Sequence, residues 1–400
     1  MISVHEAARH IHEHRVIPNI AHVPLAECTG RFLGLDIAAD RDLPPYDRIT
    51  MDGIAISFAD FQNGQRTFAI QATQAAGMPP EVLLPQHCVE AMTGAVLPVG
   101  ATTVIRYEDL AIDTLKKNAT INGATVTDGQ NIHRQGSDAR KKTLLLSKGT
   151  RLSAIEVAVL ASVGVASVPV LQPPRILLVG TGDEVVPVEE KPEAWQVRQS
   201  NASALAAALG MMGMSASSCH VADDAPMLKQ TLQAALPDYD VLILSGGVSK
   251  GKFDFIPSVL KDLGVREVFH QVAQKPGKPL WFGRSSTTTV FGLPGNPVST
   301  LICFYRYIQP WLLAGLGVPP VYREVMLAED VRFQPALTYF VPVTAHLHEG
   351  QCHAVPSAGG GSGDFVNLLG KSGFIELPPD RAWFRKGESY RFYAFSSEVW

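Results

Sequence analysis

The stretch VLILSGGVSKGKFDF, residues 241–255, places four apolar residues before a serine, two glycines, a pair of lysines and an aspartate. A short apolar run of this kind is typical of a strand buried in a parallel sheet. Two further runs also end in glycine, RILLVG (175–180) and TTTVFGLPG (287–295). Helical segments lie between them, NASALAAALGMMG (201–213) and APMLKQTLQAAL (225–236). Strand, glycine turn and helix in repetition predict a doubly wound, three-layer α/β/α domain with a mainly parallel sheet.

The chain before this domain has a different pattern of predicted secondary structure. Ser3 with Glu6, and Ser153 with Glu156, each form a capping-box signature and predict two helices. From about residue 41 to 145, between these helices, short β-like runs alternate with Gly, Pro, Asn and Asp turns. This pattern predicts a β-rich domain that is inserted into a helical one.

The pattern of predicted strands and helices changes along the chain, and LQPPR at 171–175 is a stiff linker. Together these features predict an α/β multidomain protein. After about residue 320 the chain returns to short β runs, which favour a small barrel. The predicted domains are a discontinuous, extended helical linker domain (1–40 and 141–172), an inserted β-rich domain (41–140), an α/β domain (173–320) and a C-terminal β-barrel (321–400).

Composition limits the class of protein. The 400 residues carry a formal charge of −4, whereas nucleic acid or an anionic membrane requires a large cationic surface, so we expect neither as a partner. Five cysteines without a Cys-x-x-Cys pair are typical of a reducing cytosol. The amino terminus carries charges where a signal peptide needs an apolar core, and the longest apolar stretch is too short to span a bilayer. We therefore predict a cytoplasmic protein.

The glycine turns after the three strands suggest an anion site. They are GTGDE (180–184), SGGVSKGKFD (245–254) and GLPGNPVS (292–299). Ligands of an open parallel sheet bind beyond the carboxyl ends of its strands. Glycine lets the backbone approach an anion closely, and the following helix start adds a partial positive charge. Any one of these turns alone is most simply only a turn, but three at one edge of a sheet predict a phosphate cradle.

Acidic residues in the same turns predict a divalent cation. Glu184 and Asp254 would repel a phosphate unless a cation lay between them, and Mg²⁺ uses one or two carboxylates together with phosphate oxygens. Asp223 and Asp224 precede a predicted helix and supply a further candidate ligand. Lys250 and Lys252 would balance the remaining charge.

Two other features of the sequence have simpler interpretations beside a functional one. The turn QKPGKP (274–279) holds Lys275 and Lys278 around Pro-Gly, which suits a small dianion but equally fits a solvated turn. His346 and His348 share a face of a predicted strand, and we interpret them as surface residues. The sequence contains no Gly-x-Ser-x-Gly elbow and no Walker lysine motif, so we expect metal-assisted chemistry without a covalent intermediate.

Seven motifs, in order, resemble those of the MoeA family of molybdopterin molybdenumtransferases, which are relatives of the gephyrin E domain. The resemblance covers nearly the whole chain. The motifs are LPPYDRITMDGIAI, AMTGAVLPVGA, NIHRQGSD, GTGDEVV, SGGVSKGKFDF, KPGKP and GLPGNPVST.

The resemblance implies an elongated homodimer whose active cleft lies between the α/β domain of one subunit and the inserted domain of the other. It implies Mg²⁺-dependent cleavage of adenylated molybdopterin, release of AMP, and insertion of molybdate at the dithiolene. Molybdopterin adenylyltransferase and downstream cofactor-modifying enzymes are the further partners that it suggests.

Matching the motifs position by position assigns candidate roles. The implied catalytic residues are Asp52, Asp138, Glu184 and Asp254, and the metal ligands are Glu184, Asp223, Asp224 and Asp254. The implied molybdate contacts are Lys275, Gly277, Lys278, Pro279 and Ser362. The implied substrate contacts are Thr93, Gly180, Thr181, Gly182, Asp183, Ser200, Asn201, Ser245, Gly246, Gly247, Ser249, Lys250, Gly292, Pro294, Gly295, Asn296 and Pro297.

The sequence also departs from the family pattern, at residues 48–50, Glu90, residues 199–201, Lys252 and Pro342. The changes at Lys252 and Pro342 motivate an alternative, a paralogue that binds molybdopterin as a carrier or scaffold without insertion. A second alternative, a CinA-like nucleotide-processing enzyme, is disfavoured because its α/β module lies at the amino terminus. Here that module begins near residue 175.

Overall fold

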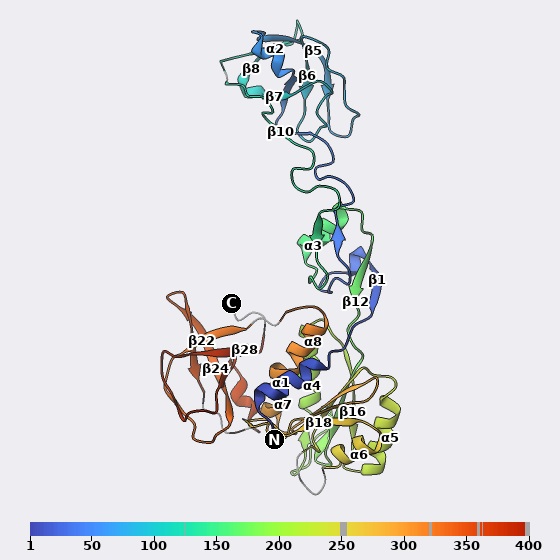
Figure 1. The fold of residues 1–400 in the computed structure, drawn as a ribbon, viewed down its shortest axis with the longest axis vertical. Coiled ribbons are helices and arrows are strands. Elements are labelled where there is room, and N and C mark those ends of the chain that lie inside the picture. Colours follow the sequence, from blue (N-terminus) through green and yellow to red (C-terminus); the bar gives the residue numbers. More distant parts are fainter. Residues whose placement is uncertain (124, 249–253, 320–321, 358–360, 362, 397–400) are drawn as a thin grey trace.

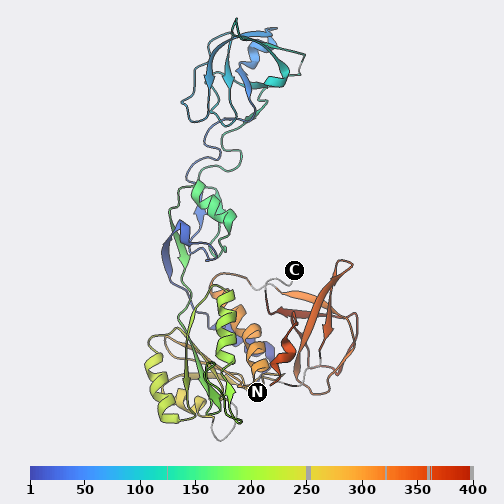
Figure 2. The same cartoon turned by 180° about the vertical axis from the view of Figure 1, so that it is seen from behind.

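The computed structural model describes residues 1–123, 125–248, 254–319, 322–357, 361 and 363–396. The molecule is elongated (Figure 1). The α/β part and the C-terminal part lie side by side at one end, the inserted part occupies the other end, and a narrow linker joins them, as the view from behind also shows (Figure 2).

A six-stranded sheet forms the centre of the α/β part, in the order β16-β13-β17-β21-β20-β18. The first four strands run parallel, while β20 and β18 add to one edge as antiparallel strands. The strands are β13 (Ile176–Thr181), β16 (Ala216–Val221), β17 (Val241–Ser245), β18 (Arg266–His270), β20 (Trp281–Arg284) and β21 (Thr289–Leu293). The helices are α4 (Asn201–Met211), α5 (Ala225–Ala235), α6 (Ile256–Asp262), α7 (Pro297–Cys303), the π-helix η3 (Phe304–Ile308) and α8 (Gln309–Gly315).

Strand β17 shows why this sheet is covered on both faces. Its residues 241–244 are fully buried, and successive side chains of a strand point to opposite faces. Val241 and Ile243 pack in the core that contains α4 and α7, whereas Leu242 and Leu244 pack in the core that contains α5 and α6. The continuous apolar run in the sequence is therefore the signature of a strand between two helical layers.

Helix α1 (Val4–Glu13) begins with the predicted capping box, in which Ser3 Oγ accepts from the Glu6 amide and the Glu6 carboxylate accepts from the Ser3 amide. Its buried residues Val4, Ala7 and Ile11 join the α4 and α7 core. Helix α1 therefore packs on the α/β part, although it precedes the linker strands in sequence.

The linker contains the pair β1 (Ile20–Pro24) and β12 (Ser167–Leu171), which run antiparallel. Helix α3 (Ala154–Ser162) covers this pair and carries the second predicted capping box. The remaining linker elements are the 3₁₀ turn η1 (Leu25–Glu27), β2 (Ile37–Ala38) and β11 (Leu144–Leu146).

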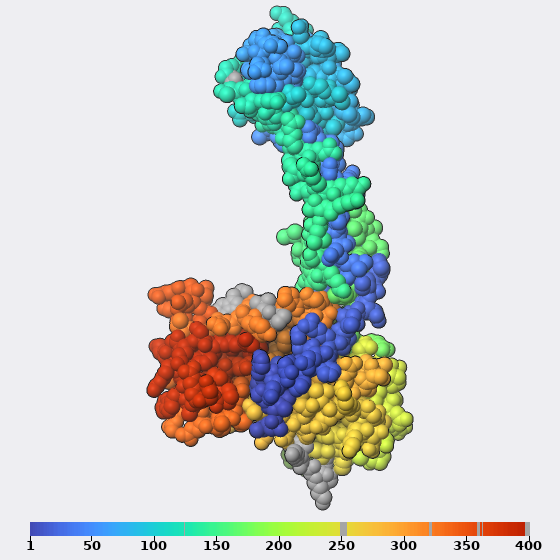
Figure 3. All heavy atoms as spheres, viewed as in Figure 1, coloured from blue at the N-terminus to red at the C-terminus, as the bar shows by residue number. Residues whose placement is uncertain are grey.

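The inserted part is a six-stranded sheet in the order β7-β4-β6-β5-β9-β8, held at the far end of the molecule (Figure 3). Its elements are β3 (Arg48–Ile49), β4 (Gly53–Ile56), α2 (Phe58–Gln62), β5 (Thr67–Gln74), β6 (His87–Ala91), β7 (Thr103–Arg106), η2 (Tyr107–Asp109), β8 (Leu110–Asp113), β9 (Asn118–Ile121) and β10 (Ile132–His133).

The C-terminal part is a sheet in the order β19-β24-β25-β22-β28-β26, which an additional β24–β26 pairing closes into a barrel. Strand β19 belongs in sequence to the α/β part, so the two parts share a ladder. The elements are β19 (Gln274–Lys275), β22 (Arg323–Leu327), β23 (Val331–Arg332), β24 (Thr338–His348), β25 (Gln351–Pro356), η4 (Phe365–Leu368), β26 (Gly373–Leu377), β27 (Trp383–Phe384) and β28 (Ser389–Ala394).

Two short strands, β14 (Val185–Val186) and β15 (Val197–Arg198), form a parallel pair beyond the end of β13. Among the described residues, no helix is both long enough and apolar enough to cross a membrane.

Candidate active site

The carboxyl ends of β13, β17 and β21 open into one cavity of about 940 Å³. Glu184, Ser245 and Asp254 all line it, so the acidic side chains and the glycine turns share one hollow. The predicted site residues that line this cleft are Gly180, Thr181, Gly182, Glu184, Ser200, Asn201, Asp223, Ser245, Gly246, Gly247, Asp254, Pro279, Pro294, Gly295, Asn296 and Pro297.

Gly246 and Gly247 form the turn after β17, with φ of 102° and 61°. A Cβ on Gly246 would lie 2.7 Å from Thr181 Oγ1 and 2.8 Å from the Thr181 carbonyl oxygen. The Gly246 amide donates to the Leu293 carbonyl oxygen at 3.2 Å, which ties the turn to β21. Both the backbone conformation and the lack of space therefore require glycine at position 246.

Two polar atoms at the cleft are buried, and neither has a hydrogen-bond partner among the described residues. They are Thr181 Oγ1 and Gln199 Nε2. Thr181 is only 8% exposed, and both residues line the cavity. An unsatisfied buried polar atom costs about 1–3 kcal/mol, so these two atoms fit a polar ligand better than an empty hollow.

Asn201 connects the three strand ends. It is the first residue of α4, and its Nδ2 donates to Ser245 Oγ and to the Gly295 carbonyl oxygen, both at 2.7 Å. Ser245 is the last residue of β17 and Gly295 follows β21, while α4 follows the β13 turn. One amide therefore holds the turns of all three strands in register around the cleft.

Carboxylates gather on one side of the cleft. Burial raises the pKa of Asp223, and the neighbouring charges of Asp183, Glu184 and Asp254 raise it further. Such an arrangement attracts a cation. Among the described residues, no three His, Cys, Asp or Glu side chains are placed to hold a metal ion by themselves. The residues fit Mg²⁺ when phosphate oxygens complete its coordination, since Mg²⁺ commonly takes only one or two carboxylates from a protein.

The adjacent Asp223 and Asp224 differ in what they contact. Asp223 lines the cleft, whereas Asp224 Oδ1 accepts from the Met227 amide at 2.7 Å and caps α5. Asp183 Oδ1 accepts from the Asp223 amide at 2.9 Å. Asp224 and Asp183 therefore have local structural contacts, and neither lines the cavity.

The predicted molybdate turn lies beside the cleft. Pro279 lines the cavity, while Lys275 and Lys278 are exposed outside its lining and Gly277 is buried with φ of 92°. Gly292, in β21, does not line the cavity either: a Cβ there would lie 2.7 Å from Val248 Cγ1. The other predicted residues of these turns lie outside the described residues: Ser249, Lys250, Lys252 and Ser362.

The three candidates of the inserted part do not line this cleft. The Thr93 amide donates to Asp52 Oδ1 at 2.6 Å and lowers the pKa of Asp52. Asp138 Oδ1 lies 2.7 Å from Nε2 of His133, whose Nδ1 lies 3.0 Å from an Arg48 guanidinium nitrogen. Figure 1 shows the inserted part at the opposite end of the molecule from the α/β sheet. Within one chain, Asp52 and Asp138 are therefore far from Asp254.

Sequence reasoning missed one wall of the cleft. It is formed by side chains of the β14–β15 segment and of the C-terminal part, namely Val185, Pro192, Val197, Arg198 and Phe365. The segment 187–196 reads as an ordinary polar loop with an exposed Trp195. The one sequence signal for a place at the cleft is that this segment follows the first glycine turn, GTGDE (180–184).

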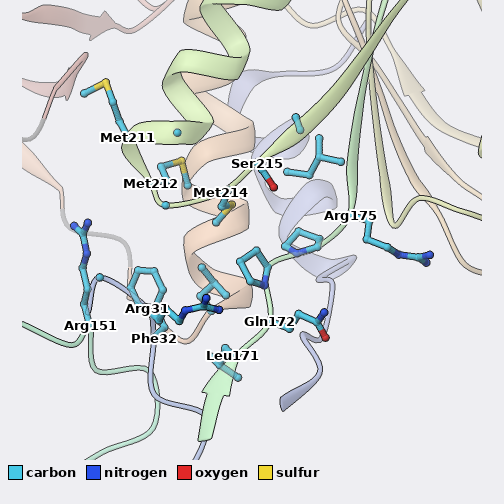
Figure 4. A pocket seen from close by; sticks show the side chains of 18 of the residues that line it. Arg31, Phe32, Arg151, Leu171, Gln172, Arg175, Met211, Met212, Met214 and Ser215 are labelled. Carbon is cyan, nitrogen blue, oxygen red and sulfur yellow. The ribbon is translucent and has the colours of Figure 1, made fainter. Parts of the chain in front are cut away.

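A second cavity, of about 1040 Å³, lies between the linker and the α/β part. Figure 4 shows Arg31, Phe32 and Arg151 below the loop that carries Met211 and Met212, with Arg175 pointing away on the other side. Arg31 Nε donates to the Glu27 carbonyl oxygen, and Arg175 pairs with Asp240. This cavity is slightly larger, but it contains none of the glycine turns or acidic candidates, so we place the active site at the strand ends.

Three family models match nearly the whole chain: "MoeA N-terminal region (domain I and II)" at residues 2–164, "Probable molybdopterin binding domain" at 177–314, and "MoeA C-terminal region (domain IV)" at 324–395. A molybdopterin molybdenumtransferase from Synechocystis sp. is 41% identical over 372 residues, 92% of this chain and 93% of the relative. One from Bacillus subtilis is 31% identical over 408 residues, 99% and 95% of the two chains.

A solved structure supports the same assignment. The molybdopterin biosynthesis MoeA protein from Pyrococcus horikosii matches 99% of this chain and 100% of its own, with a TM-score of 0.88 and 29% identity. This match confirms the predicted fold class. Because all three family regions match in order and the Synechocystis relative is 41% identical, the chain belongs to the MoeA family of molybdopterin molybdenumtransferases.

Proposed function

We propose that this protein completes molybdenum cofactor assembly. It takes adenylated molybdopterin, hydrolyses the phosphoanhydride with release of AMP in a Mg²⁺-dependent step, and inserts molybdate at the dithiolene. The observation that carries the proposal is the convergence of three glycine turns with Glu184, Asp223 and Asp254 in one cavity. Membership of the molybdenumtransferase family supplies the substrate class.

The backbone supplies most of the binding for the diphosphate. The Gly247 amide lies in a turn without side chains and is offered to the cleft, while the Gly246 amide holds the turn against β21, and the start of α4 adds the positive end of its dipole. Thr181 Oγ1 and Gln199 Nε2 provide buried polar groups for the remaining oxygens. Fixed donors of this kind are already oriented before the substrate arrives, so they stabilise developing charge without reorganisation.

The carboxylates supply the other part of the chemistry. Glu184, Asp223 and Asp254 would hold Mg²⁺ together with phosphate oxygens, and Mg²⁺ supplies charge neutralisation at the anhydride. A carboxylate of this group also orients the attacking water. The water oxygen would form a new bond to one phosphorus of the anhydride while that carboxylate accepts the water proton. The bond from this phosphorus to the bridging oxygen breaks, so AMP and molybdopterin separate without a covalent enzyme intermediate.

Molybdate would bind at the turn 275–279 beside the cleft. Lys275 and Lys278 are exposed cations on a turn whose last residue, Pro279, lines the cavity. The dithiolene sulfurs are soft ligands that suit molybdenum, so the protein needs only to position the oxyanion.

The cleft is completed by a second copy of the chain in this proposal. Asp52, Thr93 and Asp138 lie on the inserted part, at the far end of the elongated molecule. In a two-fold dimer, the inserted part of one chain reaches the strand ends of the other. The homodimer is therefore part of the proposed mechanism.

The decisive assay combines purified protein, adenylated molybdopterin, Mg²⁺ and molybdate, and follows AMP. We expect release well above background in the wild type. Asp254→Ala should abolish release and leave binding of the pterin largely intact, because the amide cradle does not depend on that carboxylate. Pterin binding without AMP release by the wild type would support the carrier alternative, and unchanged turnover of the variant would remove Asp254 from the site.

A further inference from the structure

A buried polar network lies directly behind the turn 275–279, at the junction of the α/β part and the C-terminal barrel. Gln274, Arg306 and Tyr307 are 1%, 7% and 2% exposed. Buried polar side chains are costly unless each is paired, and here the pairing crosses from one part to the other. The proposed mechanism makes no use of this network so far.

Gln274 connects the network to the turn. The Tyr307 hydroxyl donates to Gln274 Oε1, and Gln274 Nε2 donates to the Pro276 carbonyl oxygen at 3.2 Å. The same nitrogen lies 3.5 Å from Cys303 Sγ. The Gln274 amide therefore has one end held by Tyr307 and the other end bound to the backbone of the turn.

Gly277 is packed against the same amide. A Cβ at this position would lie 2.6 Å from Gln274 Nε2 and 2.7 Å from Cys303 Sγ. The backbone between Lys275 and Lys278 therefore rests on the Gln274 side chain, without space for adjustment. A movement of that amide would move both flanking lysines.

The barrel holds the other end of the network. Glu376, in β26, accepts from Arg306 Nε and from the Tyr393 hydroxyl, both at 2.8 Å. The Arg306 guanidinium lies 5.0 Å from the Tyr307 ring centre and 5.3 Å from that of Tyr393. Burial lowers the pKa of Arg306, but Glu376, Tyr393 and Tyr307 together outweigh burial and raise this pKa. The charged guanidinium lies over the Tyr307 ring, and so connects Glu376 to the residue that holds Gln274.

A backbone ladder reinforces this connection. Gln274 pairs with Thr338 and Lys275 with Tyr339, in parallel register between β19 and β24. Lys275 Nζ lies 5.7 Å from the ring centre of Phe333, a barrel residue that stacks on Tyr339. The barrel therefore contacts both the backbone and the side chain of Lys275, at the first end of the turn.

We propose that Glu376, Arg306, Tyr307 and Gln274 act as positioning residues that set the spacing of Lys275 and Lys278 for a tetrahedral oxyanion. The inference rests on the proposed function, because it assumes that the turn 275–279 binds molybdate. It gives the C-terminal barrel a role in anion affinity, because Glu376 of the barrel holds the network that supports the turn. A network that served stability alone would not distinguish one substrate from the other.

The test compares two tyrosines in the same helix. Tyr307→Phe removes the hydroxyl that holds Gln274. Tyr305→Phe is the matched control, since Tyr305 is also buried and its hydroxyl donates to the Phe395 carbonyl oxygen at 2.8 Å, away from the turn. The assay measures molybdenum incorporation against molybdate concentration, and calorimetric titration with molybdate gives a second readout without turnover.

We expect Tyr307→Phe to raise the KM and the Kd for molybdate about tenfold, on the scale of one lost buried hydrogen bond. The KM for adenylated molybdopterin and the kcat should stay within about twofold, and Tyr305→Phe should resemble the wild type in every constant. Glu376→Gln, which keeps the shape of the side chain, should shift molybdate affinity in the same direction. If Tyr307→Phe does not fold, the molybdate affinity of Glu376→Gln tests the positioning role instead.

The outcomes separate this inference from the proposed function. If the wild type saturates with molybdate and Tyr307→Phe matches Tyr305→Phe, the positioning role is wrong and the proposed function stands. If both tyrosine variants lose stability and all constants change together, the network is only structural. If wild-type turnover shows no dependence on molybdate, the proposed function fails first, and this inference with it.

Discussion

At the scale of single residues, the cleft depends on the absence of side chains as much as on their presence. Gly246 has a φ of 102°, and a Cβ added there would lie too close to Thr181 for any side chain to be accommodated. Gly182 has a φ of 132°, and a Cβ there would lie 2.7 Å from the Glu184 carboxylate. These glycines bring backbone amides and carboxylates into one small space, which is what a diphosphate with its cation requires.

Gly246→Ala should therefore damage the site more than an ordinary glycine substitution. The left-handed backbone costs a non-glycine residue about 1–3 kcal/mol, and the contact with Thr181 adds to that. We expect a lower melting temperature and a loss of affinity for adenylated molybdopterin, measured by thermal denaturation and by titration.

Gly210→Ala is the control for this substitution. Gly210 lies in α4, and a Cβ there would meet no atom within 4 Å. Alanine in a helix should stabilise the protein by up to about 1 kcal/mol and leave affinity unchanged. Equal affinities in the two variants would show that the β17 turn does not bind the substrate.

At the scale of elements, the helix starts determine what neighbouring acids can do. Asp224 caps α5 through the Met227 amide, while Asp223, one residue earlier, faces the cleft. Sequence alone left the choice between these two acids open, because they are adjacent and both precede a helix. The cap separates them, since a carboxylate oxygen that holds a helix start is less available to a metal.

A matched pair of substitutions tests this difference. Asp224→Ala should lose about 1 kcal/mol of stability, as expected for a lost N-cap, and keep its Mg²⁺ dependence. Asp223→Asn should raise the Mg²⁺ concentration for half-maximal AMP release about tenfold or more.

The stability of the Asp223 variant should change in the opposite direction. Burial, and then the neighbouring carboxylates, raise the pKa of Asp223, so above that pKa its charge opposes folding, and a neutral asparagine relieves both the burial of charge and the repulsion. We therefore expect a small rise in melting temperature at pH 7. A matching loss of stability in both variants, with Mg²⁺ dependence unchanged, would contradict the assignment of Asp223.

The predictability of the elements follows from whether their signals are local. The helices with capping boxes and the three strands with glycine turns were predictable, because their residues are contiguous in sequence. The antiparallel additions β18 and β20 were not, since edge order is a matter of tertiary packing. The wall that contains Pro192 and Arg198 was missed for the same reason: a loop carries no periodicity that shows what it will pack against.

At the scale of the whole molecule, the length of the linker decides the architecture of the site. The inserted part cannot reach the strand ends of its own chain in this arrangement, as both ribbon views show. The candidates Asp52 and Asp138 can therefore act at a cleft only if it belongs to another copy.

Mixing two inactive variants tests this arrangement. We expect Asp52→Asn and Asp254→Asn to be inactive alone, and a mixture of equal amounts, after subunit exchange, to regain about a quarter of wild-type AMP release. Half of the dimers would be mixed, and each mixed dimer would have one intact site of two. No recovery after proven exchange would place both aspartates in the same site of one chain, and activity of Asp52→Asn alone would place Asp52 outside any site.

The most direct measurement is a crystal structure of the protein with adenylated molybdopterin, prepared without divalent metal so that the substrate stays intact. Our account predicts the diphosphate against the Gly246–Gly247 turn and the Gly247 amide, within reach of Thr181 Oγ1 and beside the carboxylates of Glu184 and Asp254. Substrate bound instead in the cavity between Arg31 and Met212, with the strand-end cleft empty, would contradict it.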